Sequence, residues 1–208
     1  MKRLSYEELI SDLIKKLDNI KNRYLIALAG PPASGKTTVS EKITKDLNLK
    51  GYPSNILQMD AFHYDNGILE NKGLLSKKGS SETFDVMGLK NFLNRLNDED
   101  EVIVPIFDRS LELSKSSAVI ISKKTRDIIV EGNYLLLNSE PWKKLHNYFQ
   151  SKIIIDCEEK IREERLVKRW ENFNLPKEEI HKKVYENDLP NGLNVLKNSI
   201  EADYTLIN

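Results

Sequence analysis

The sequence has one cysteine, no excess of either charge and no long apolar run. Cys157 alone cannot form an internal disulfide, which excludes a disulfide-stabilised extracellular scaffold. Thirty-two basic residues balance thirty-two acidic ones, so the net charge gives no long-range attraction to nucleic acid or anionic membranes. No stretch reaches the roughly eighteen apolar residues that span a bilayer. These absences predict a cytoplasmic protein that binds neither nucleic acid nor membrane.

The length of 208 residues suits one large domain, so we expect residues 1–208 to fold as a single unit. Residues 1–22 are predicted to form an N-terminal helix that begins near residue 6. Ser5 and Glu8 have the spacing of a capping box, and apolar residues recur after them at helical intervals. This helix is interpreted as scaffold.

Apolar runs and amphipathic stretches alternate through the rest of the chain. The runs typical of strands buried on both faces are residues 25–29, 56–59, 102–107, 128–130 and 153–155. The amphipathic helical stretches are residues 36–48, 86–97, 141–150 and 159–172. The pattern predicts an α/β protein with a three-layer fold around a central parallel sheet.

Two stretches are expected to move over bound ligands. Residues 61–83 contain three glycines and few apolar positions, so we predict a long loop that covers the substrate. Residues 159–175 are predicted to form a small helical lid.

A phosphate-binding motif follows the first buried run. Its sequence is Gly30-Pro31-Pro32-Ala33-Ser34-Gly35-Lys36-Thr37, which satisfies G-x-x-x-x-G-K-[ST] between a strand and a helix. Backbone N–H groups of such a loop face phosphate oxygens at a helix N-terminus. We therefore predict that this loop and Thr38 bind ATP, that Lys36 contacts its phosphates and that Thr37 ligates Mg²⁺.

Acidic residues follow the predicted strands, at Asp60, Asp108, Glu131 and Asp156. Ligands of open α/β sheets bind outside the carboxyl ends of the strands, so these carboxylates are predicted to converge near the phosphates. Phosphoryl transfer needs one carboxylate as base and another near magnesium, for which Asp60 and Glu131 are the candidates. A turn or helix cap is an equally common role for any one such residue.

Three arginines of the predicted lid, Arg162, Arg165 and Arg169, lie on one helical face and could close over the nucleotide. The alternative is a solvated face paired with neighbouring glutamates. His63 lies three residues after Asp60, where it could contact substrate. Trp142 and Trp170 occupy apolar helical positions and are predicted to be core residues.

These ordered motifs resemble the P-loop kinase family that contains phosphoribulokinase, uridine kinase and bacterial-type pantothenate kinase. The resemblance also covers Lys77-Lys78-Gly79, Thr83-Phe84-Asp85, residues 105–109, residues 131–136 and Asn187-Asp188 with Pro190-Asn191. It implies that Asp60 is the base, that Glu131 lies near magnesium and that Arg165 and Arg169 are lid arginines. The substrate-binding residues that it implies are Lys78, Asp85, Asp108, Arg109, Asn187 and Asn191.

Two departures bear on the substrate. Arg109-Ser110-Leu111-Glu112 stands where uridine kinases carry a histidine, which argues against pyrimidine recognition. The extra pocket segments of pantothenate kinases cannot be located. Pro190 is predicted to interrupt a helix beside Asn187 and Asn191.

The leading hypothesis is a kinase that transfers the γ-phosphoryl group of ATP, with Mg²⁺, to a hydroxyl of a nucleoside, pantothenate or a sugar. The alternative is an ATP-binding regulatory or switch module. The guanine-binding sequence Asn-Lys-x-Asp is absent, which argues against a GTPase. A nucleic-acid-dependent ATPase is disfavoured by the zero net charge. The sequence leaves a homodimer open.

Overall fold

A computed structural model describes residues 2–20 and 22–207, and its centre is a sheet of six parallel strands. The strand order is β1-β8-β7-β2-β6-β3. The bounds are Lys2–Leu4 for β1, Tyr24–Ala29 for β2, Ser54–Gln58 for β3, Asp127–Glu131 for β6, Ser151–Asp156 for β7 and Tyr204–Ile207 for β8. Four of these are predicted strands, and the predicted parallel sheet is confirmed.

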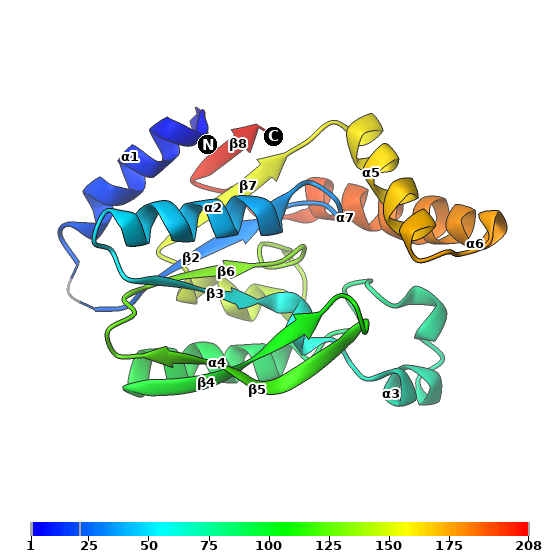
Figure 1. The fold of residues 1–208 in the computed structure, drawn as a ribbon, viewed down its shortest axis with the longest axis horizontal. Helices are drawn as coiled ribbons and strands as arrows, with labels where there is room; N and C mark the ends of the chain where they lie inside the picture. Colours follow the sequence, from blue (N-terminus) through cyan, green and yellow to red (C-terminus); the bar gives the residue numbers. More distant parts are fainter. Residues whose placement is uncertain (1, 21, 208) are drawn as a thin grey trace.

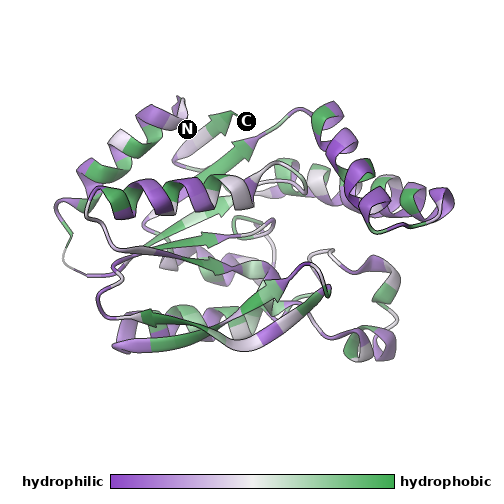
Figure 2. Ribbon diagram, viewed as in Figure 1, coloured by the Kyte–Doolittle hydropathy of each residue, from purple (hydrophilic) through white to green (hydrophobic). Residues whose placement is uncertain are grey.

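Helices cover both faces of the sheet (Figure 1). On one face, α1 (Tyr6–Leu17) and α2 (Lys36–Leu49) pack on alternate residues of β2, such as Ile26. On the other face, α4 (Val86–Asp98) packs on the intervening residues, such as Ala27. Figure 2 shows hydrophobic residues along the central strands and polar residues on the outer helix surfaces. The three-layer α/β fold is therefore confirmed.

The N-terminal helix α1 begins where its capping box predicts. The Ser5 side chain accepts from the Glu8 N–H, and the Glu8 carboxylate accepts from the Ser5 N–H. The helix is shorter than the predicted span of 1–22, because β1 precedes it and pairs with β8. Met1 and Lys21 of that span lie outside the described residues. No helix within the described ranges is long and apolar enough to cross a bilayer.

The predicted strand 102–107 does not belong to the parallel sheet. It is β4 (Glu101–Asp108), which pairs antiparallel with β5 (Leu113–Ser122) in a separate hairpin. Val102 and Val104 are buried whereas Ile103 is 42% exposed, so only one face packs on the protein. Gln58 Oε1 accepts from the Phe107 N–H at 3.0 Å and ties the hairpin to the end of β3. The prediction failed because the polar composition of β5 conceals a strand partner.

The substrate-covering segment 61–83 is not the structureless loop that its glycines predict. It contains the end of a 3₁₀ turn (Met59–Phe62), the short helix α3 (Asn66–Asn71) and a second 3₁₀ turn (Leu75–Lys77). Three side chains from distant elements donate to backbone carbonyls at its C-terminal end. The bonds run from Asn187 Nδ2 to Lys78 O at 3.1 Å, from Tyr134 Oη to Gly79 O at 2.7 Å and from Trp142 Nε1 to Ser81 O at 3.1 Å.

Two helix predictions near the C-terminus are corrected. The stretch 141–150 forms a 3₁₀ helix over Trp142–Tyr148, whereas α5 (Glu159–Asn172) matches its prediction. Pro190 does not interrupt a helix, because α6 (Lys177–His181) continues through a π-helical segment (Lys182–Asp188) into α7 (Leu189–Asn198). The Leu189 N–H donates to the Val184 carbonyl five residues back, so the wider turn accommodates a proline that has no N–H.

Candidate active site

The phosphate loop, residues 30–38, curls between the end of β2 and the start of α2. Ala33 and Gly35 have left-handed φ angles of 59° and 91°, which turn successive N–H groups inward. A side chain at Gly30 would place its Cβ 3.2 Å from Ile155 Cβ, so only glycine lets the loop pack this closely on β7. The loop is thus preformed as an anion-binding cradle at a helix N-terminus.

Lys36 is buried at the base of this cradle, where its Nζ donates to the Pro31 carbonyl at 3.0 Å. Burial lowers the pKa of Lys36 to about 8, against the opposing attraction of Glu131 and Asp60. A buried ammonium that hydrogen-bonds a neutral oxygen keeps its charge available for an anion. The predicted phosphate contact of Lys36 therefore agrees with its surroundings.

Glu131 ends β6 directly behind the phosphate loop and is 3% exposed. Burial and the nearby charge of Asp60 raise the pKa of Glu131 to about 7, although Lys36, Arg109 and a hydrogen bond with Thr37 oppose this. The next residue must be glycine, because a Cβ at Gly132 would lie 2.3 Å from the Met59 side chain. That close approach brings the ends of β3 and β6 together, as predicted for Asp60 and Glu131.

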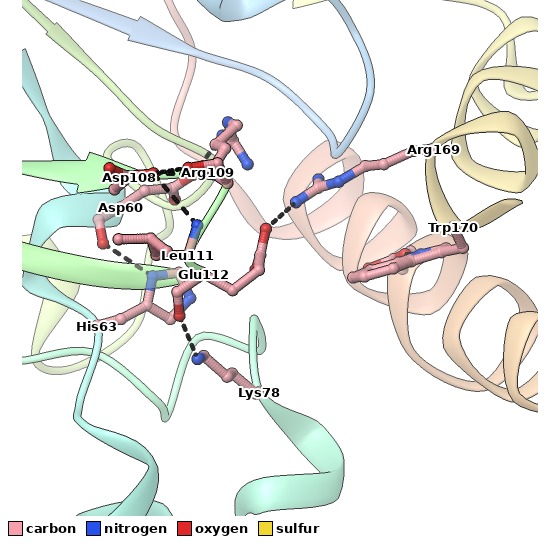
Figure 3. Close-up of polar contacts among 11 residues, drawn as sticks. Asp60, His63, Lys78, Asp108, Arg109, Leu111, Glu112, Arg169 and Trp170 are labelled. Atoms are coloured by element: carbon pink, nitrogen blue, oxygen red, sulfur yellow. Dashed lines mark hydrogen bonds and ion pairs between the residues drawn. The ribbon is translucent and has the colours of Figure 1, made fainter. Parts of the chain in front are cut away.

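Asp60 lies in the 3₁₀ turn after β3, and its side chain is 18% exposed. Arg109 Nη2 donates to Asp60 Oδ2 at 2.7 Å, and His63 Nδ1 lies 2.9 Å from the Asp60 carbonyl (Figure 3). Burial favours the neutral acid, but Arg109, His63 and Lys36 outweigh it and lower the pKa of Asp60. Asp60 is therefore an ionised carboxylate next to the phosphate loop.

The three arginines of α5, the helix of the predicted lid, separate into two groups. Arg165 Nη1 donates to the Ala33 carbonyl at 3.1 Å, and Arg169 Nη2 lies 3.4 Å from Glu112 Oε1. Arg162 instead is 1% exposed and donates from Nε to the Cys157 carbonyl, so it braces the base of α5. Of the three arginines, Arg165 and Arg169 line the cavity beside the phosphate loop and Arg162 does not, so a contact with nucleotide stays a prediction for Arg165 and Arg169.

These groups open onto one cavity of about 850 Å³, within the range of small-molecule sites. The predicted site residues that line it are Pro32, Ala33, Gly35, Lys36, Thr37, Thr38, Asp60, His63, Lys78, Arg109, Arg165 and Arg169. Gly30, Pro31, Ser34 and Glu131 lie in the loop or behind it. The cavity thus joins the phosphate loop, the predicted base and the lid.

Four of the predicted substrate-binding residues and the strand-end acid Asp156 also lie outside that lining. The Asp85 carboxylate accepts from the Gly88 N–H at 2.8 Å and caps α4. Asp108 accepts from Ser110 Oγ at 2.6 Å and stabilises the hairpin turn. Asn187 and Asn191 bond each other at 3.0 Å. Asp156 pairs with Arg3 at the surface, so this strand-end acid does not join the others.

Several cavity residues escaped the sequence analysis, namely Asn66, Leu75, Phe84, Phe107, Glu112, Asn133, Trp170, Phe173, Lys183 and Asp188. Trp170, predicted to be core, is half-buried on the lid and donates from Nε1 to Asp188 Oδ2 at 2.8 Å. The Glu112 side chain reaches toward Arg169, while its carbonyl accepts from Lys78 Nζ at 2.9 Å (Figure 3). Phe84, Phe107, Asn133 and Asp188 lie within the family motifs quoted above, which could have indicated them. The other residues carry no local signal, because distant elements bring them together.

A second hollow of about 560 Å³ lies between α4 and the β4–β5 hairpin. Its lining includes Asp85, Phe92, Arg95 and Ser116, and it shares only His63 with the larger cavity. The phosphate loop does not reach it, so the chemistry belongs to the larger cavity.

The oxygen ligands near the phosphate loop fit a magnesium ion that also binds the phosphates of a nucleotide. Within the described ranges, no group of three or more His, Cys, Asp or Glu side chains is placed to hold a metal. Magnesium, however, is usually held by one or two carboxylates together with substrate phosphates and water. Thr37 and the buried Glu131 supply a hydroxyl and a carboxylate beside the phosphate cradle.

Comparisons with known proteins match this geometry. A family model described as an AAA domain matches residues 26–186. The putative uridine kinase of Schizosaccharomyces pombe is 30% identical over 97% of this chain and 90% of its own. A crystal structure of a putative fructose transport system kinase from Silicibacter sp. TM1040 superposes with a TM-score of 0.91 at 33% identity, covering 97% of this chain and 98% of that one. Pantothenate kinase of Enterococcus faecalis is 27% identical over 71% of this chain but only 48% of its own.

Proposed function

The chain belongs to the P-loop kinase family of phosphoribulokinase, uridine kinase and pantothenate kinase, and from this premise we propose that it transfers the γ-phosphoryl group of ATP to a hydroxyl of a small metabolite. The observation that supports the proposal most is that the Asp60 carboxylate and the Lys36 ammonium line one cavity. A base and a phosphate-binding cation are the two groups that must face each other across the transferred phosphoryl group.

On the nucleotide side, the loop N–H groups and Lys36 bind the β- and γ-phosphates of ATP. Arg165 and Arg169 approach from the lid and stabilise the charge on the phosphoryl oxygens as the bond to the leaving group lengthens. Thr37 and Glu131 would hold Mg²⁺, which neutralises phosphate charge when bound. Positioning and electrostatics supply most of the catalysis in such transfers.

On the acceptor side, Asp60 accepts the proton of the attacking hydroxyl. The acceptor oxygen forms a bond to the γ-phosphorus, the bond from the γ-phosphorus to the bridging oxygen breaks, and ADP leaves. Arg109 keeps Asp60 ionised and oriented through its 2.7 Å hydrogen bond. The low pKa of Asp60 suits a loose transition state, in which the hydroxyl proton transfers late.

The test measures ADP formation against a panel of nucleosides, pantothenate and sugars, with Asp60→Asn as the diagnostic variant. We expect acceptor-dependent turnover by the native protein and a fall of about 10²- to 10⁴-fold in kcat for the variant, with ATP binding retained. Asp156→Asn is the matched control, since it removes another strand-end carboxylate that lies outside the cavity.

The alternative, an ATP-binding regulatory module, predicts a different result. Such a protein would bind ATP but show no acceptor-dependent ADP release across the panel, and Asp60→Asn would leave control of its partner intact. Full turnover by Asp60→Asn would instead remove Asp60 from the role of base.

A further inference from the structure

Lys78 presents a preorganised cation to the cavity. Its backbone carbonyl accepts from Asn187 Nδ2 at 3.1 Å, and its Nζ donates to Asn66 Oδ1 at 2.8 Å and to the Glu112 carbonyl at 2.9 Å. Both oxygens that the ammonium meets are neutral. Burial lowers the pKa of Lys78, with Lys183 adding to this and Glu112 and Asp65 opposing it. The fold therefore holds this charge at an energetic cost without neutralising it.

Lys183 brings a second cation to the same cavity from the π-helical segment. Its Nζ lies 4.5 Å from the centroid of the Trp170 ring, and Lys78 and Lys183 are close enough for their charges to repel each other. Neither lysine forms an ion pair with a residue in the ranges that the structure describes. An anion between them would relieve the repulsion and supply the missing partner.

The acidic residues nearby form their hydrogen bonds with other groups, although Lys183 also attracts Asp188. The Asp65 carboxylate accepts from the Gly67 N–H at 2.9 Å. The Glu112 carboxylate lies 3.4 Å from Arg169 Nη2, and the Asp188 carboxylate accepts from the Trp170 indole at 2.8 Å. Six cationic and three acidic side chains line the cavity, so the positive excess extends beyond the phosphate loop.

The position of Lys78 identifies which substrate it would meet. Lys78 belongs to the segment 61–83, which is predicted to cover the substrate, and contacts the hairpin turn that also carries Arg109, the partner of Asp60 (Figure 3). It therefore lies on the side of the cavity where the acceptor must present its hydroxyl to Asp60. Phe84, Phe107 and Leu75 line the same region and offer apolar surface for a carbon skeleton.

We propose that the acceptor carries an anionic group, a carboxylate or a phosphate, which Lys78 binds together with Lys183 while the hydroxyl meets Asp60. The proposal rests on the kinase activity proposed above and narrows its substrate class. It sets the chain apart from a kinase whose acceptor is a neutral nucleoside.

The experiment compares acceptor pairs that differ only in the anionic end. Suitable pairs are glycerate with glycerol, gluconate with glucitol, pantothenate with pantothenyl alcohol, and sugar phosphates with the free sugars. We expect kcat/KM to be at least about tenfold higher for the charged member of the accepted pair. The hydroxy acids and the sugar phosphates form separate arms, which distinguish a carboxylate from a phosphate.

Lys78→Met and Lys183→Met should each lower kcat/KM at least about tenfold more for the charged member than for the neutral member, while the KM for ATP changes little. Lys77→Met and Lys182→Met are matched controls, because these neighbouring lysines are exposed and lie outside the cavity lining. Preference for the neutral member, or an effect of Lys78→Met on the KM for ATP alone, would overturn the proposal.

A second measurement is independent of turnover. Acetate and inorganic phosphate are titrated onto protein saturated with a non-hydrolysable ATP analogue, while the Trp170 indole N–H is followed by NMR. A saturable shift that Lys78→Met and Lys183→Met abolish supports the anion site. Inactivity of every acceptor tested would then count against the proposed kinase activity and not against the anion site. The absence of a saturable shift would count against the anion site.

Discussion

The two sides of the cavity are built in different ways. The donor side comprises the phosphate loop with Glu131. The curl of the loop uses contacts close in sequence, such as Lys36 with Pro31 five residues away, while Arg165 and Glu131 contact the loop from distant parts of the chain. The acceptor side comprises Asp60, His63, Lys78, Arg109 and Glu112. Three of its contacts join residues 34 to 109 positions apart, from Lys78 with Glu112 to Lys78 with Asn187, and only the contacts of His63 with Asp60 and of Lys78 with Asn66 among those described above are shorter in sequence.

This difference explains why the donor side would bind any nucleoside triphosphate whereas the acceptor side would select its substrate. A loop defined by its own backbone presents the same cradle to any nucleoside triphosphate. A surface assembled from the 61–83 segment, the hairpin turn and the π-helical segment changes shape whenever one of these elements changes. Substrate identity can thus vary in this architecture while the phosphate chemistry is retained.

The largest expected effect is that of Lys36→Met on the donor side, which should lower kcat without lowering the melting temperature. Lys36→Met removes the phosphate-binding cation, so kcat should fall by about 10²- to 10³-fold. The melting temperature of the nucleotide-free protein should not fall, because the variant also removes a buried charge whose pKa burial lowers to about 8. Lys45→Met, on the exposed face of the same helix, is the control for both measurements. If Lys36→Met keeps its turnover, the phosphate loop does not supply the chemistry that the comparison assigns to the donor side.

The next effect is a pH dependence at the boundary between the two sides. Burial and Asp60 raise the pKa of Glu131 from 4.5 to about 7 in the folded protein, so the folded state retains a proton that the unfolded chain releases between these values. The free energy of unfolding should therefore decrease as pH rises from about 4.5 to 7.

Glu131→Gln should flatten this part of the curve in urea titrations of the nucleotide-free protein at several pH values. Glu41→Gln changes an exposed glutamate on α2 and should leave the slope as it is. An unchanged slope in Glu131→Gln would place the titrating group elsewhere.

The smallest effect is confined to the acceptor side. Tyr134→Phe removes the hydrogen bond that holds the Gly79 carbonyl, at a cost of about 1 kcal/mol in stability. Because Lys78 is adjacent to Gly79, the KM for the acceptor should rise by about three- to tenfold while the KM for ATP stays constant.

Tyr148→Phe is its matched control, since the Tyr148 hydroxyl bonds the Asn94 side chain away from the cavity. The control should lose comparable stability without a change in either KM. An equal rise in both KM values for Tyr134→Phe would show that the two sides are mechanically coupled.

Sequence reasoning succeeded where the information is local. The phosphate loop needs only its own glycines and flanking elements, and Asp60 and Glu131 follow buried strands that meet at one edge of the sheet. The same reasoning placed 102–107 in that sheet, because an apolar run does not distinguish a parallel strand from one half of a hairpin.

The rest of the site depends on tertiary structure. Trp170 occupies an apolar helical position in the sequence and packs against the small buried cluster of Leu166, Ile180 and Val184, but part of its indole also forms the cavity wall. Asp85 follows the family pattern of a substrate-binding residue, yet its carboxylate caps α4, a role that the glycine three residues later could have indicated. The contribution of Lys183 depends on a π-helical turn that no sequence rule used above predicts.

That π-helical turn also sets the angle about the helix axis between Lys183 and Asp188. Hydrogen bonds in a π turn join residues five apart, so Lys183 and Asp188 lie above one another on a single wall of the cavity. At 3.6 residues per turn the same two positions would diverge by about 140°. One inserted or deleted residue between them would rotate the lid-side lysine relative to the buried face of α7. Chain length within these seven positions, as much as side-chain identity, decides what the cavity presents to its acceptor.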